Sequence, residues 1–271
     1  MKLYEKSICV MTCTLCTLNC RLCASCIPAF RESKIAYFYD TEHYKKDMRE
    51  VFSIYDHVET VSLTGGEPLL HKQLADIVAF SLREFPTKFD TLRITTNGTM
   101  LPDESLLLAI RSYAKDNVLF VLDDYGAPSN KVSDVVEILE QNQIPCRVNH
   151  YWGDDQHCGG WVDLGPMDQF RGYSNEEVQH IAAHCHFGQW KCLTIFEGKL
   201  FPCNWAFCGT ALGYFNFYAD GYIDLAGTTQ TLEEKIKIAS MFGKKANMAC
   251  QYCNGFDPET SPRFPAGEQI V

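Results

Sequence analysis

The sequence predicts an α/β protein: a partial (β/α)6 TIM-like barrel followed by a small C-terminal subdomain built from a β-hairpin and a helix. Short apolar, β-rich runs alternate with segments of helical period about five times over residues 1–152. Such alternation with short connections calls for a parallel sheet covered by helices. The alternation stops near Tyr151, and a hairpin pattern follows farther along the chain. We therefore expect two domains, over residues 1–175 and 176–271.

The barrel elements follow in order along the first domain. Tyr44, Met48, Val51, Phe52 and Tyr55 recur at helical spacing and predict the first helix. The expected helices cover residues 41–55, 72–83, 103–114 and 132–141. The expected strands, which are apolar or alternating, cover residues 7–12, 58–64, 91–96, 117–122 and 145–151. Chemistry in such folds gathers at the carboxyl ends of the strands.

The second domain carries fewer periodic segments. Residues 152–173 are rich in Gly, Asp and aromatic residues, and we expect a loop that closes the barrel or faces the substrate. A glycine turn at Gly198 predicts a hairpin, and Thr231 is a good N-cap for the helix that follows. The expected elements are a helix over residues 175–183, hairpin strands over 190–196 and 199–201, and a helix over 231–241. Residues 258–271 are expected to form a loop or terminal arm.

Composition and charge restrict the class of function. The chain has 271 residues, of which 46% are hydrophobic, enough for one large core with a small appendage. A net charge of −10 argues against a nucleic-acid groove or an anionic membrane as a partner. No apolar run approaches the ~18–20 residues of a membrane span, and the N-terminus lacks a secretory signal. We expect a cytoplasmic protein without nucleic-acid or membrane partners.

Fourteen cysteines in such a chain predict metal or redox sites, because a reducing compartment keeps thiols free. Most fall into two groups, over residues 9–26 and 185–253, which suggests two metal sites. In the first group Cys16, Cys20 and Cys23 form a C-x3-C-x2-C run. Such tight spacing lets three thiolates converge on one iron–sulfur cluster and leave a fourth iron open. Zinc held by C-x2-C pairs in a structural scaffold is the alternative.

Polar motifs stand at the ends of the later strands. Gly65, Gly66 and Glu67 follow the second strand, and Thr96 and Asn97 end the third. Paired glycines let the backbone approach a ligand closely, and a neighbouring carboxylate can accept bonds from an ammonium group. Each motif alone also fits an ordinary turn. The candidate substrate contacts at the fourth and fifth strand ends are Asp123, Asp124, Tyr125 and His150.

The order of these motifs resembles the radical S-adenosylmethionine (radical SAM) superfamily over roughly residues 1–152. The resemblance implies a 4Fe–4S cluster at the three cysteines, whose open iron chelates S-adenosylmethionine. It places the Gly-Gly-Glu motif at the methionine amino group, and Thr96 and Asn97 near the ribose or carboxylate. One position departs from the family: the residue before the third cysteine is often aromatic and lies near adenine. Here it is Leu22, which can still cover the adenine face.

The second group of cysteines resembles the C-terminal cluster domain called SPASM, or its shorter form, twitch. The pattern is a cysteine, a hairpin, a second cysteine and a later C-x2-C pair. The ligands implied for one auxiliary 4Fe–4S cluster are Cys185, Cys203, Cys250 and Cys253. Cys192 competes with Cys185 for the first position, and a four-cysteine zinc site is the alternative. We expect His184 and His186 to pack or to support the ligands rather than to bind metal.

The resemblance also implies the reaction. One electron, supplied by a flavodoxin- or ferredoxin-type donor, cleaves S-adenosylmethionine, and the resulting 5′-deoxyadenosyl radical removes a hydrogen atom from the substrate. The barrel begins almost at Met1 without a domain for a leader peptide, which favours a small polar substrate such as a sugar or aminocyclitol. Oxidation would give a ketone, whereas epimerisation would need a hydrogen-atom donor, for which Cys208 is the candidate. A peptide maturase that forms a crosslink or a D-residue is the alternative.

Overall fold

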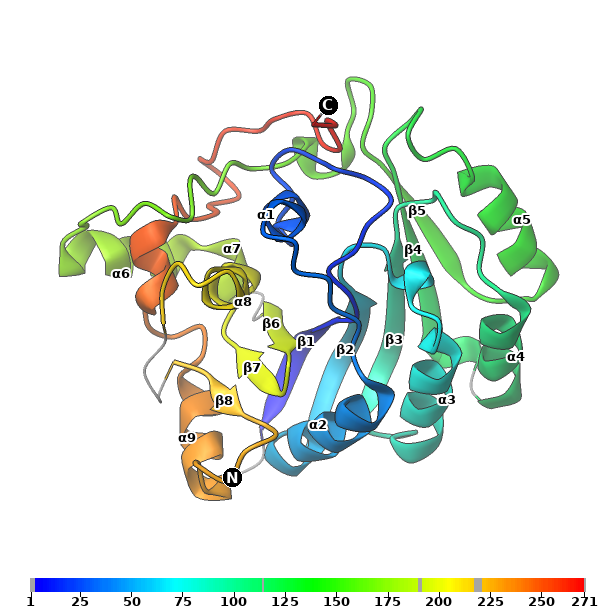
Figure 1. The fold of residues 1–271 in the computed structure, drawn as a ribbon, viewed down its shortest axis with the longest axis horizontal. Coiled ribbons are helices and arrows are strands. Elements are labelled where there is room, and N and C mark those ends of the chain that lie inside the picture. The colour runs from blue at the N-terminus through cyan, green and yellow to red at the C-terminus, as the bar shows by residue number, and fades with distance from the viewer. Residues whose placement is uncertain (1–2, 114, 190–191, 217–220, 271) are drawn as a thin grey trace.

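The computed structural model describes residues 3–113, 115–189, 192–216 and 221–270 of the chain. Its strands form one sheet in the order β5-β4-β3-β2-β1-β6-β7-β8 (Figure 1). The strands are β1 (Tyr4–Met11), β2 (His57–Thr64), β3 (Phe89–Thr96), β4 (Val118–Asp124), β5 (Cys146–His150), β6 (Cys192–Phe196), β7 (Lys199–Phe201) and β8 (Ile223–Asp224). Strands β1 to β6 run parallel, and β7 and β8 are antiparallel. This mostly parallel sheet confirms the predicted α/β class and partial TIM-like barrel.

Helices α2 to α5 lie in sequence between the parallel strands and cover one face of the sheet (Figure 1). The helices are α1 (Ile27–Glu32), α2 (Thr41–Ile54), α3 (Leu74–Glu84), α4 (Glu104–Tyr113), α5 (Val132–Gln141), α6 (Asn175–His184), α7 (His186–Gln189), α8 (Asn204–Ala211) and α9 (Leu232–Met241). Short 3-10 turns are η1 (Pro68–Leu70), η2 (Lys115–Asn117), η3 (His157–Gly159) and η4 (Met248–Tyr252).

One large apolar core holds these helices on the sheet. Met48 of α2, Ile77 of α3 and Val135 of α5 are fully buried against strand residues such as Val61 and Phe120. A smaller apolar cluster joins α1, α8 and η4, with its members drawn from both ends of the chain. The larger core holds the helices against the sheet, and the smaller one lies beside the cysteine loop, with Cys16 and Cys23 packed against it.

The predicted elements agree closely with the observed ones, with two differences. Helices α1, α7 and α8 and strand β8 were not predicted, and residues 114, 190 and 191 of predicted elements lie outside the described residues. In addition, β6 pairs in parallel with β1, with Ile8 opposite Leu193. The sheet therefore continues across the predicted division at residues 175 and 176, and that division stays a prediction.

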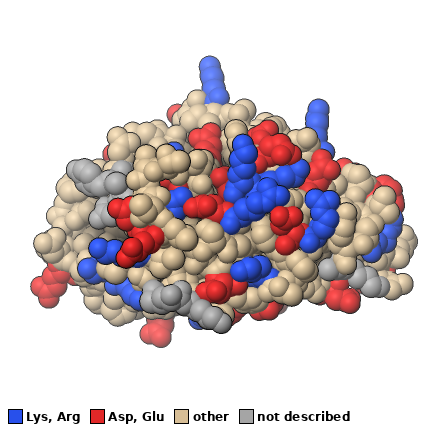
Figure 2. Space-filling view, turned by 90° about the horizontal axis from the view of Figure 1, so that it is seen from below, with Lys and Arg blue, Asp and Glu red and all other residues tan. Residues whose placement is uncertain are grey.

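The charge on the surface and the lengths of the helices are relevant to the kinds of partner that were predicted to be absent. On the face seen from below in Figure 1, basic and acidic side chains lie interspersed (Figure 2). Such a mixture gives only a weak net field over this face. Within the described residues, no helix combines the length and apolar character needed to cross a membrane.

Candidate active site

A cavity of about 570 Å³ lies at the carboxyl ends of the parallel strands, where the fold class places ligands. Its wall is built from both halves of the chain. The residues lining it include Cys16, Cys20, Leu22, Cys23, Gly65, Gly66, Thr96, Asn97, Asp123, Tyr125, Tyr151, Cys158, Trp161, His186, Phe187, Phe256 and Arg263. Three predicted cluster cysteines and most of the predicted cofactor contacts therefore share one hollow.

The cysteine loop follows β1 and receives N–H donors at two of its sulfurs. The backbone N–H of Leu18 and the side-chain amide of Asn97 lie 3.5 and 3.4 Å from Cys16 Sγ. The Gln269 amide lies 3.1 Å from Cys20 Sγ. Hydrogen bonds of this kind stabilise negatively charged sulfur, so the surroundings of these cysteines suit thiolate ligands.

Burial controls the protonation of the free thiols. It raises the pKa of Cys20 to about 11 and that of Cys23 to about 12, and nearby thiols add to both shifts. These groups therefore carry protons at neutral pH in the apoprotein. Metal must displace those protons on binding, so cluster loading is expected to be favoured at higher pH.

Cys13 and Cys26 flank the run and were expected not to be ligands. Cys13 is fully buried, and its Sγ lies 3.3 Å from the backbone oxygen of Glu67. Cys26 adopts a positive φ of 55° and belongs to the smaller apolar cluster. Neither is among the described residues that line the cavity. Their surroundings are those of structural residues.

The Gly-Gly-Glu segment after β2 is pressed against the cysteine loop. The N–H groups of Gly66 and Glu67 each donate at 2.8 Å to backbone oxygens of Cys13 and Leu15. A Cβ on Gly65 would lie 2.5 Å from the Cys13 oxygen, and one on Gly66 would lie 1.9 Å from the Leu15 oxygen. Both glycines line the cavity, but the close approach that requires them is to the protein's own backbone.

Glu67 lies behind the cavity wall rather than in it. Its carboxylate is fully buried and accepts the N–H groups of Leu69 at 3.1 Å and Asn97 at 2.8 Å. Burial raises its pKa to about 7, although the N–H bonds pull in the opposite direction. Glu67 is not one of the described residues lining the cavity. It instead positions Asn97, which in turn meets Cys16.

The loop after β3 presents an ordered set of polar groups. Thr96 is almost fully buried, and Asn97 is 8% exposed. The Asn97 amide donates to Thr17 Oγ1 at 3.0 Å, and its oxygen accepts the N–H of Thr99 at 3.1 Å. These hydrogen bonds hold the Asn97 side chain in one orientation at the cavity.

The four predicted substrate contacts divide into two pairs. Asp123 and Tyr125 line the cavity, but Asp124 and His150 lie on the other side of the sheet. There the Asp124 carboxylate accepts the Trp152 indole N–H at 2.9 Å and lies 3.1 Å from His150 Nδ1. Because successive strand residues point to opposite faces, Asp123 and Asp124 cannot share a site. The structure therefore places Asp124 and His150 away from this cavity, and the substrate contacts predicted for them stay a prediction.

Asp123 is held as a buried carboxyl group. The Asn149 amide donates to it at 2.9 Å, and burial raises its pKa to about 6 despite the attraction of Arg93 and Arg147. A carboxyl group with this pKa can exchange a proton near neutral pH.

Aromatic residues form much of the remaining wall, and of these only Tyr125 was among the predicted site residues. Tyr125 and Tyr151 stack with ring centroids 5.3 Å apart, and Trp161 meets Tyr125 edge-on at 5.5 Å. The guanidinium of Arg263 lies 5.0 Å from the ring centre of Phe256. The aromatic content of residues 152–173 was a signal for part of this wall, whereas Phe256 and Arg263 come from a segment without periodicity.

Cys208, the predicted hydrogen-atom donor, lies elsewhere. It is fully buried in α8, among the apolar cluster and beside Cys26. It is not one of the described residues that line the cavity. The structure thus places the Cys208 thiol out of reach of the cavity, and its role as a hydrogen-atom donor stays a prediction.

The second group of cysteines comes together on the other side of the smaller apolar cluster, which also packs against Cys16 and Cys23. Cys203 is partly buried, and the thiols of Cys250, Cys185 and Cys253 add to the rise in its pKa that burial causes. Cys192 instead lies on β6 and has Cys9 of β1 as its strongest thiol neighbour. This arrangement fits the predicted set with Cys185 in first position.

Two further observations concern possible ligands. Within the described residues, no group of three His, Cys, Asp or Glu side chains is arranged to hold a single metal ion. The His184 ring packs 4.2 Å from that of His180, and the His186 ring packs 4.8 Å from that of Phe256. Both histidines thus make the packing contacts that were predicted for them.

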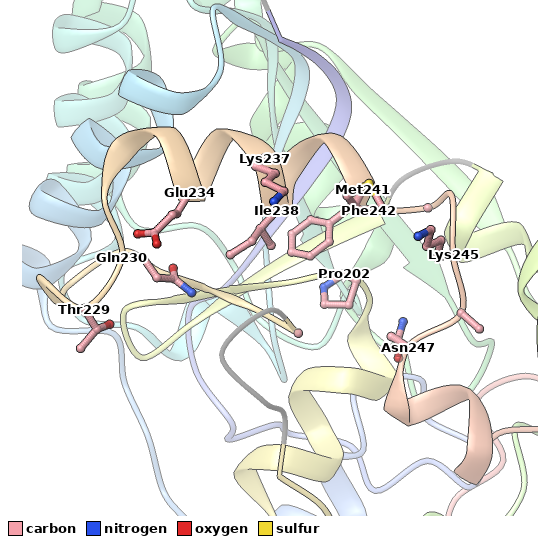
Figure 3. A pocket seen from close by; sticks show the side chains of 13 residues that line it. Pro202, Thr229, Gln230, Glu234, Lys237, Ile238, Met241, Phe242, Lys245 and Asn247 are labelled. Carbon is pink, nitrogen blue, oxygen red and sulfur yellow. The ribbon is translucent and has the colours of Figure 1, made fainter.

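A second cavity of about 550 Å³ opens along α9 (Figure 3). Lys237, Ile238 and Phe242 of the helix region line it, with Pro202 opposite. Of the described residues that line it, none is a cysteine. The cavity at the strand ends is therefore the one where cofactor chemistry can be assembled.

Comparisons with known proteins agree with this geometry. A GTP 3′,8-cyclase from Synechococcus sp. (strain CC9902) is 32% identical over 114 residues, or 42% of this chain and 32% of the cyclase. The match thus spans about a third of that relative's length. BtrN in complex with AdoMet and 2-DOIA has a TM-score of 0.53 at 18% identity, covering 98% of this chain and 99% of BtrN.

A similar structure is anSMEcpe with bound AdoMet and Cp18Cys peptide, with a TM-score of 0.54 at 13% identity, covering 98% of this chain and 92% of that one. At such identities the two structures show a shared fold. The sequence carries the family itself, because the model of the Radical SAM superfamily matches residues 8–141, the segment that holds the cysteine loop and the first strand-end motifs. Residues 8–141 of this chain thus carry the sequence pattern of the radical SAM superfamily.

Proposed function

We propose that this protein is a radical SAM oxidoreductase whose 4Fe–4S cluster is held by Cys16, Cys20 and Cys23. The observation that carries the proposal is the convergence of these three free thiols on one cavity, with amide donors at Cys16 and Cys20. The chemistry that the bound groups supply is reductive cleavage of S-adenosylmethionine to a 5′-deoxyadenosyl radical, which removes a hydrogen atom from the substrate.

The cofactor half of the cavity has the groups that S-adenosylmethionine requires. Gly65 and Gly66 expose backbone beside the cysteine loop, and Thr96 and Asn97 present a hydroxyl and an amide. Leu22 supplies an apolar surface for a base. Glu67 acts indirectly, by fixing Asn97 through its backbone N–H.

The substrate half favours oxidation of a small polar molecule, such as a sugar or aminocyclitol. The cavity volume of about 570 Å³ lies in the range of small-molecule sites, roughly 300–1,000 Å³. Asp123 would accept the hydroxyl proton while the carbon loses its hydrogen atom, and Tyr125 and Trp161 would enclose the ring. With Cys208 away from the cavity, epimerisation lacks the donor first considered for it.

We further propose that Cys185, Cys203, Cys250 and Cys253 hold an auxiliary 4Fe–4S cluster. When bound there, such a cluster would supply an acceptor for the second electron of an oxidation. Cys185 follows α6, Cys203 precedes α8, and Cys250 and Cys253 lie in and directly after η4, so cluster binding would tie these elements together. A peptide substrate is the second candidate, since the similar fold of anSMEcpe is seen with a peptide, whereas BtrN is seen with 2-DOIA.

Anaerobic reconstitution with iron and sulfide tests the proposal. We expect a brown protein with broad absorbance near ~400 nm that cleaves S-adenosylmethionine to 5′-deoxyadenosine when reduced by dithionite or by reduced flavodoxin. The Cys16→Ala, Cys20→Ala and Cys23→Ala variants should lose cleavage, whereas Cys146→Ala, on β5 and away from both groups, should keep it. A colourless, zinc-loaded protein that never cleaves S-adenosylmethionine would overturn the enzyme assignment.

Substrate class and outcome need a second experiment. Candidate alcohols, aminocyclitols and peptides are incubated with the reduced enzyme in deuterated water. A ketone without solvent deuterium at carbon supports oxidation. Deuterium at an inverted carbon would show epimerisation with a thiol donor other than Cys208, and a crosslinked peptide would show a maturase.

A further inference from the structure

The C-terminal segment of the chain, residues 266–270, lies along the cysteine loop as a short antiparallel strap. The N–H of Arg21 donates to the Glu268 oxygen, and the N–H of Ile270 donates to the Asn19 oxygen, each at 2.7 Å. Between these bonds, Cys20 and Gln269 face each other as an antiparallel bridge. Figure 1 shows the red end of the chain arriving beside the blue loop that follows β1. Segments about 250 residues apart in the chain thus meet at one predicted cluster ligand.

The side chain of Gln269 has a fixed direction within this strap. Its oxygen accepts the backbone N–H of Asn19 at 2.8 Å. Its amide nitrogen donates to the Gly267 oxygen at 2.6 Å and to Cys20 Sγ at 3.1 Å. Turning the amide over would set its oxygen against another oxygen and leave the Asn19 N–H facing a donor. The network therefore directs an N–H group at the sulfur.

The strap is anchored from the cavity side as well. Gly267 adopts a φ of +68°, and a Cβ there would lie 2.5 Å from Tyr125 Cδ1, so the backbone rests directly on this ring. The N–H of Ala266 donates to the Gln156 side chain at 3.2 Å. These contacts hold the donor at its distance from Cys20 independently of the exposed end of the strap.

We propose that Gln269 is a positioning residue that sets the reduction potential of the S-adenosylmethionine-binding cluster through its hydrogen bond to Cys20. The inference rests on the proposed function, because it requires a cluster at this loop. Hydrogen bonds to ligand sulfur stabilise the more negatively charged, reduced state and so raise the potential. The strap would thus make the cluster easier to reduce by a cellular donor, and electron entry would depend on the C-terminal segment being seated.

Two substitutions separate the donor from the packing. Gln269→Leu removes both polar groups at similar size, whereas Gln269→Glu keeps the acceptor for Asn19 and sets a negatively charged oxygen where the donor was. Glu268→Gln is the matched control on the same strap. It removes an ion pair of 2.5 Å with Arg21, whose side chains are 44% exposed for Arg21 and 51% exposed for Glu268, so its loss should have little effect on the cluster. Iron content is measured for each reconstituted protein before its potential.

The measurement is a redox titration followed by electron paramagnetic resonance. The relevant signal is the one that changes when S-adenosylmethionine is added, which distinguishes it from any auxiliary cluster. We expect a lower midpoint potential in both Gln269 variants, with the Glu variant at least as low as the Leu variant. The Glu268→Gln potential should equal that of the wild type.

Each outcome decides the inference. A wild-type potential in Gln269→Glu would overturn it, because the donor is then without effect. Loss of the cluster from both Gln269 variants but not from Glu268→Gln would also overturn it, since Gln269 would then hold the loop rather than tune the cluster. A wild-type protein without any signal responsive to S-adenosylmethionine would instead defeat the proposed function.

Discussion

At the scale of single residues, the site retains two buried carboxyl groups that do not stabilise the fold when ionised. Burial raises the pKa of Asp123 to about 6 and that of Glu67 to about 7. The burial of Glu67 has a structural explanation, because its carboxylate accepts the backbone N–H groups of Leu69 and Asn97. Asp123 accepts a hydrogen bond from Asn149 and faces the cavity. A buried carboxyl group with a shifted pKa in a cavity is typical of a functional site.

Asp123→Asn is expected to stabilise the apoprotein at alkaline pH. The pKa of Asp123 is raised from ~3.9 in the unfolded chain to about 6 in the folded protein. The wild-type carboxyl group therefore contributes its full stability below the unfolded pKa, where it is protonated, and this stability is lost as pH rises through the folded pKa. Allowing for partial exposure, we expect the variant to gain about 1–3 kcal/mol at pH 8. Asn can still accept the Asn149 bond. Urea unfolding at pH 4 and pH 8 measures the difference.

The same variant supplies its own functional check. If Asp123 accepts a proton from substrate, product formation should fall by roughly 10²–10⁴-fold while iron content stays unchanged. A variant with unchanged stability at both pH values would contradict the raised pKa of Asp123. Full turnover would remove Asp123 from the proposed mechanism.

Gly66→Ala should damage the cysteine loop by steric contact alone. The added Cβ would lie 1.9 Å from the Leu15 backbone oxygen, which cannot move without breaking the bond from the Glu67 N–H. We expect a loss of at least about 2 kcal/mol in the free energy of unfolding, together with reduced iron content. Thermal unfolding and iron analysis measure both.

Gly188→Ala is the matched control for this prediction. A Cβ there meets its nearest neighbour, the Ala182 oxygen, at 3.4 Å, which is an ordinary contact. The control should change stability by less than about 1 kcal/mol and leave iron content unaltered. Equal effects of the two substitutions would show that the tight approach at Gly66 is relieved by small backbone shifts.

At the scale of elements, most helices and strands were predicted from the regular spacing of their apolar residues. Strands β1 to β5 and helices α2 to α5 were predicted because each buries one continuous face. Helix α8 was missed because residues such as Trp205, Ala206, Phe207 and Cys208 are buried all round, which leaves no amphipathic period to detect. Helix α1 has six residues, too few for a period to be recognised.

The candidate site was predictable in part for a related reason. Motif order along the chain located Cys16, Gly65 and Asn97 at one cavity, since parallel strand ends must meet at one edge. The sequence did not predict which of two adjacent residues, such as Asp123 and Asp124, points into the cavity. Side chains alternate between the two faces of a strand, and the sequence does not show which face a given residue takes. The same uncertainty at the end of β4 for Asp124 and at the end of β5 for His150 explains why both lie away from the cavity.

The choice between Cys185 and Cys192 can be decided by iron content. Cys185 lies with Cys203, Cys250 and Cys253, whereas Cys192 lies on β6 beside Cys9. We expect reconstituted wild-type protein to hold roughly eight irons and Cys185→Ala roughly four, because only the auxiliary cluster is lost. Cys192→Ala should keep roughly eight.

Iron analysis alone would not identify the site, so cleavage of S-adenosylmethionine is followed in parallel. It should persist in Cys185→Ala, since the first cluster is untouched. The reverse pattern, with iron lost in Cys192→Ala and kept in Cys185→Ala, would assign the first auxiliary ligand to β6.

At the scale of the whole molecule, the two halves are bound together by more than the cavity. Strand β6 supplies the second neighbour of β1, and β7 and β8 extend the sheet beyond it. Lys235 of α9, only 4% exposed, lies 2.6 Å from Glu50 of α2. The predicted domains therefore share a sheet, an ion pair and a site, and their separate stability becomes a physical question.

We expect residues 1–175 not to fold alone. Without β6, the buried Ile8 and Val10 of β1 would stand on an open sheet edge, which favours aggregation. A fragment of residues 1–242 keeps β6 to β8 and α9, so it should stay monomeric and unfold cooperatively. Size-exclusion chromatography and urea unfolding compare the two fragments with the full chain. If residues 1–175 were monomeric and unfolded cooperatively, the parallel strands would be an independent barrel, and the pairing of β1 with β6 would be an accessory contact rather than part of the folding unit.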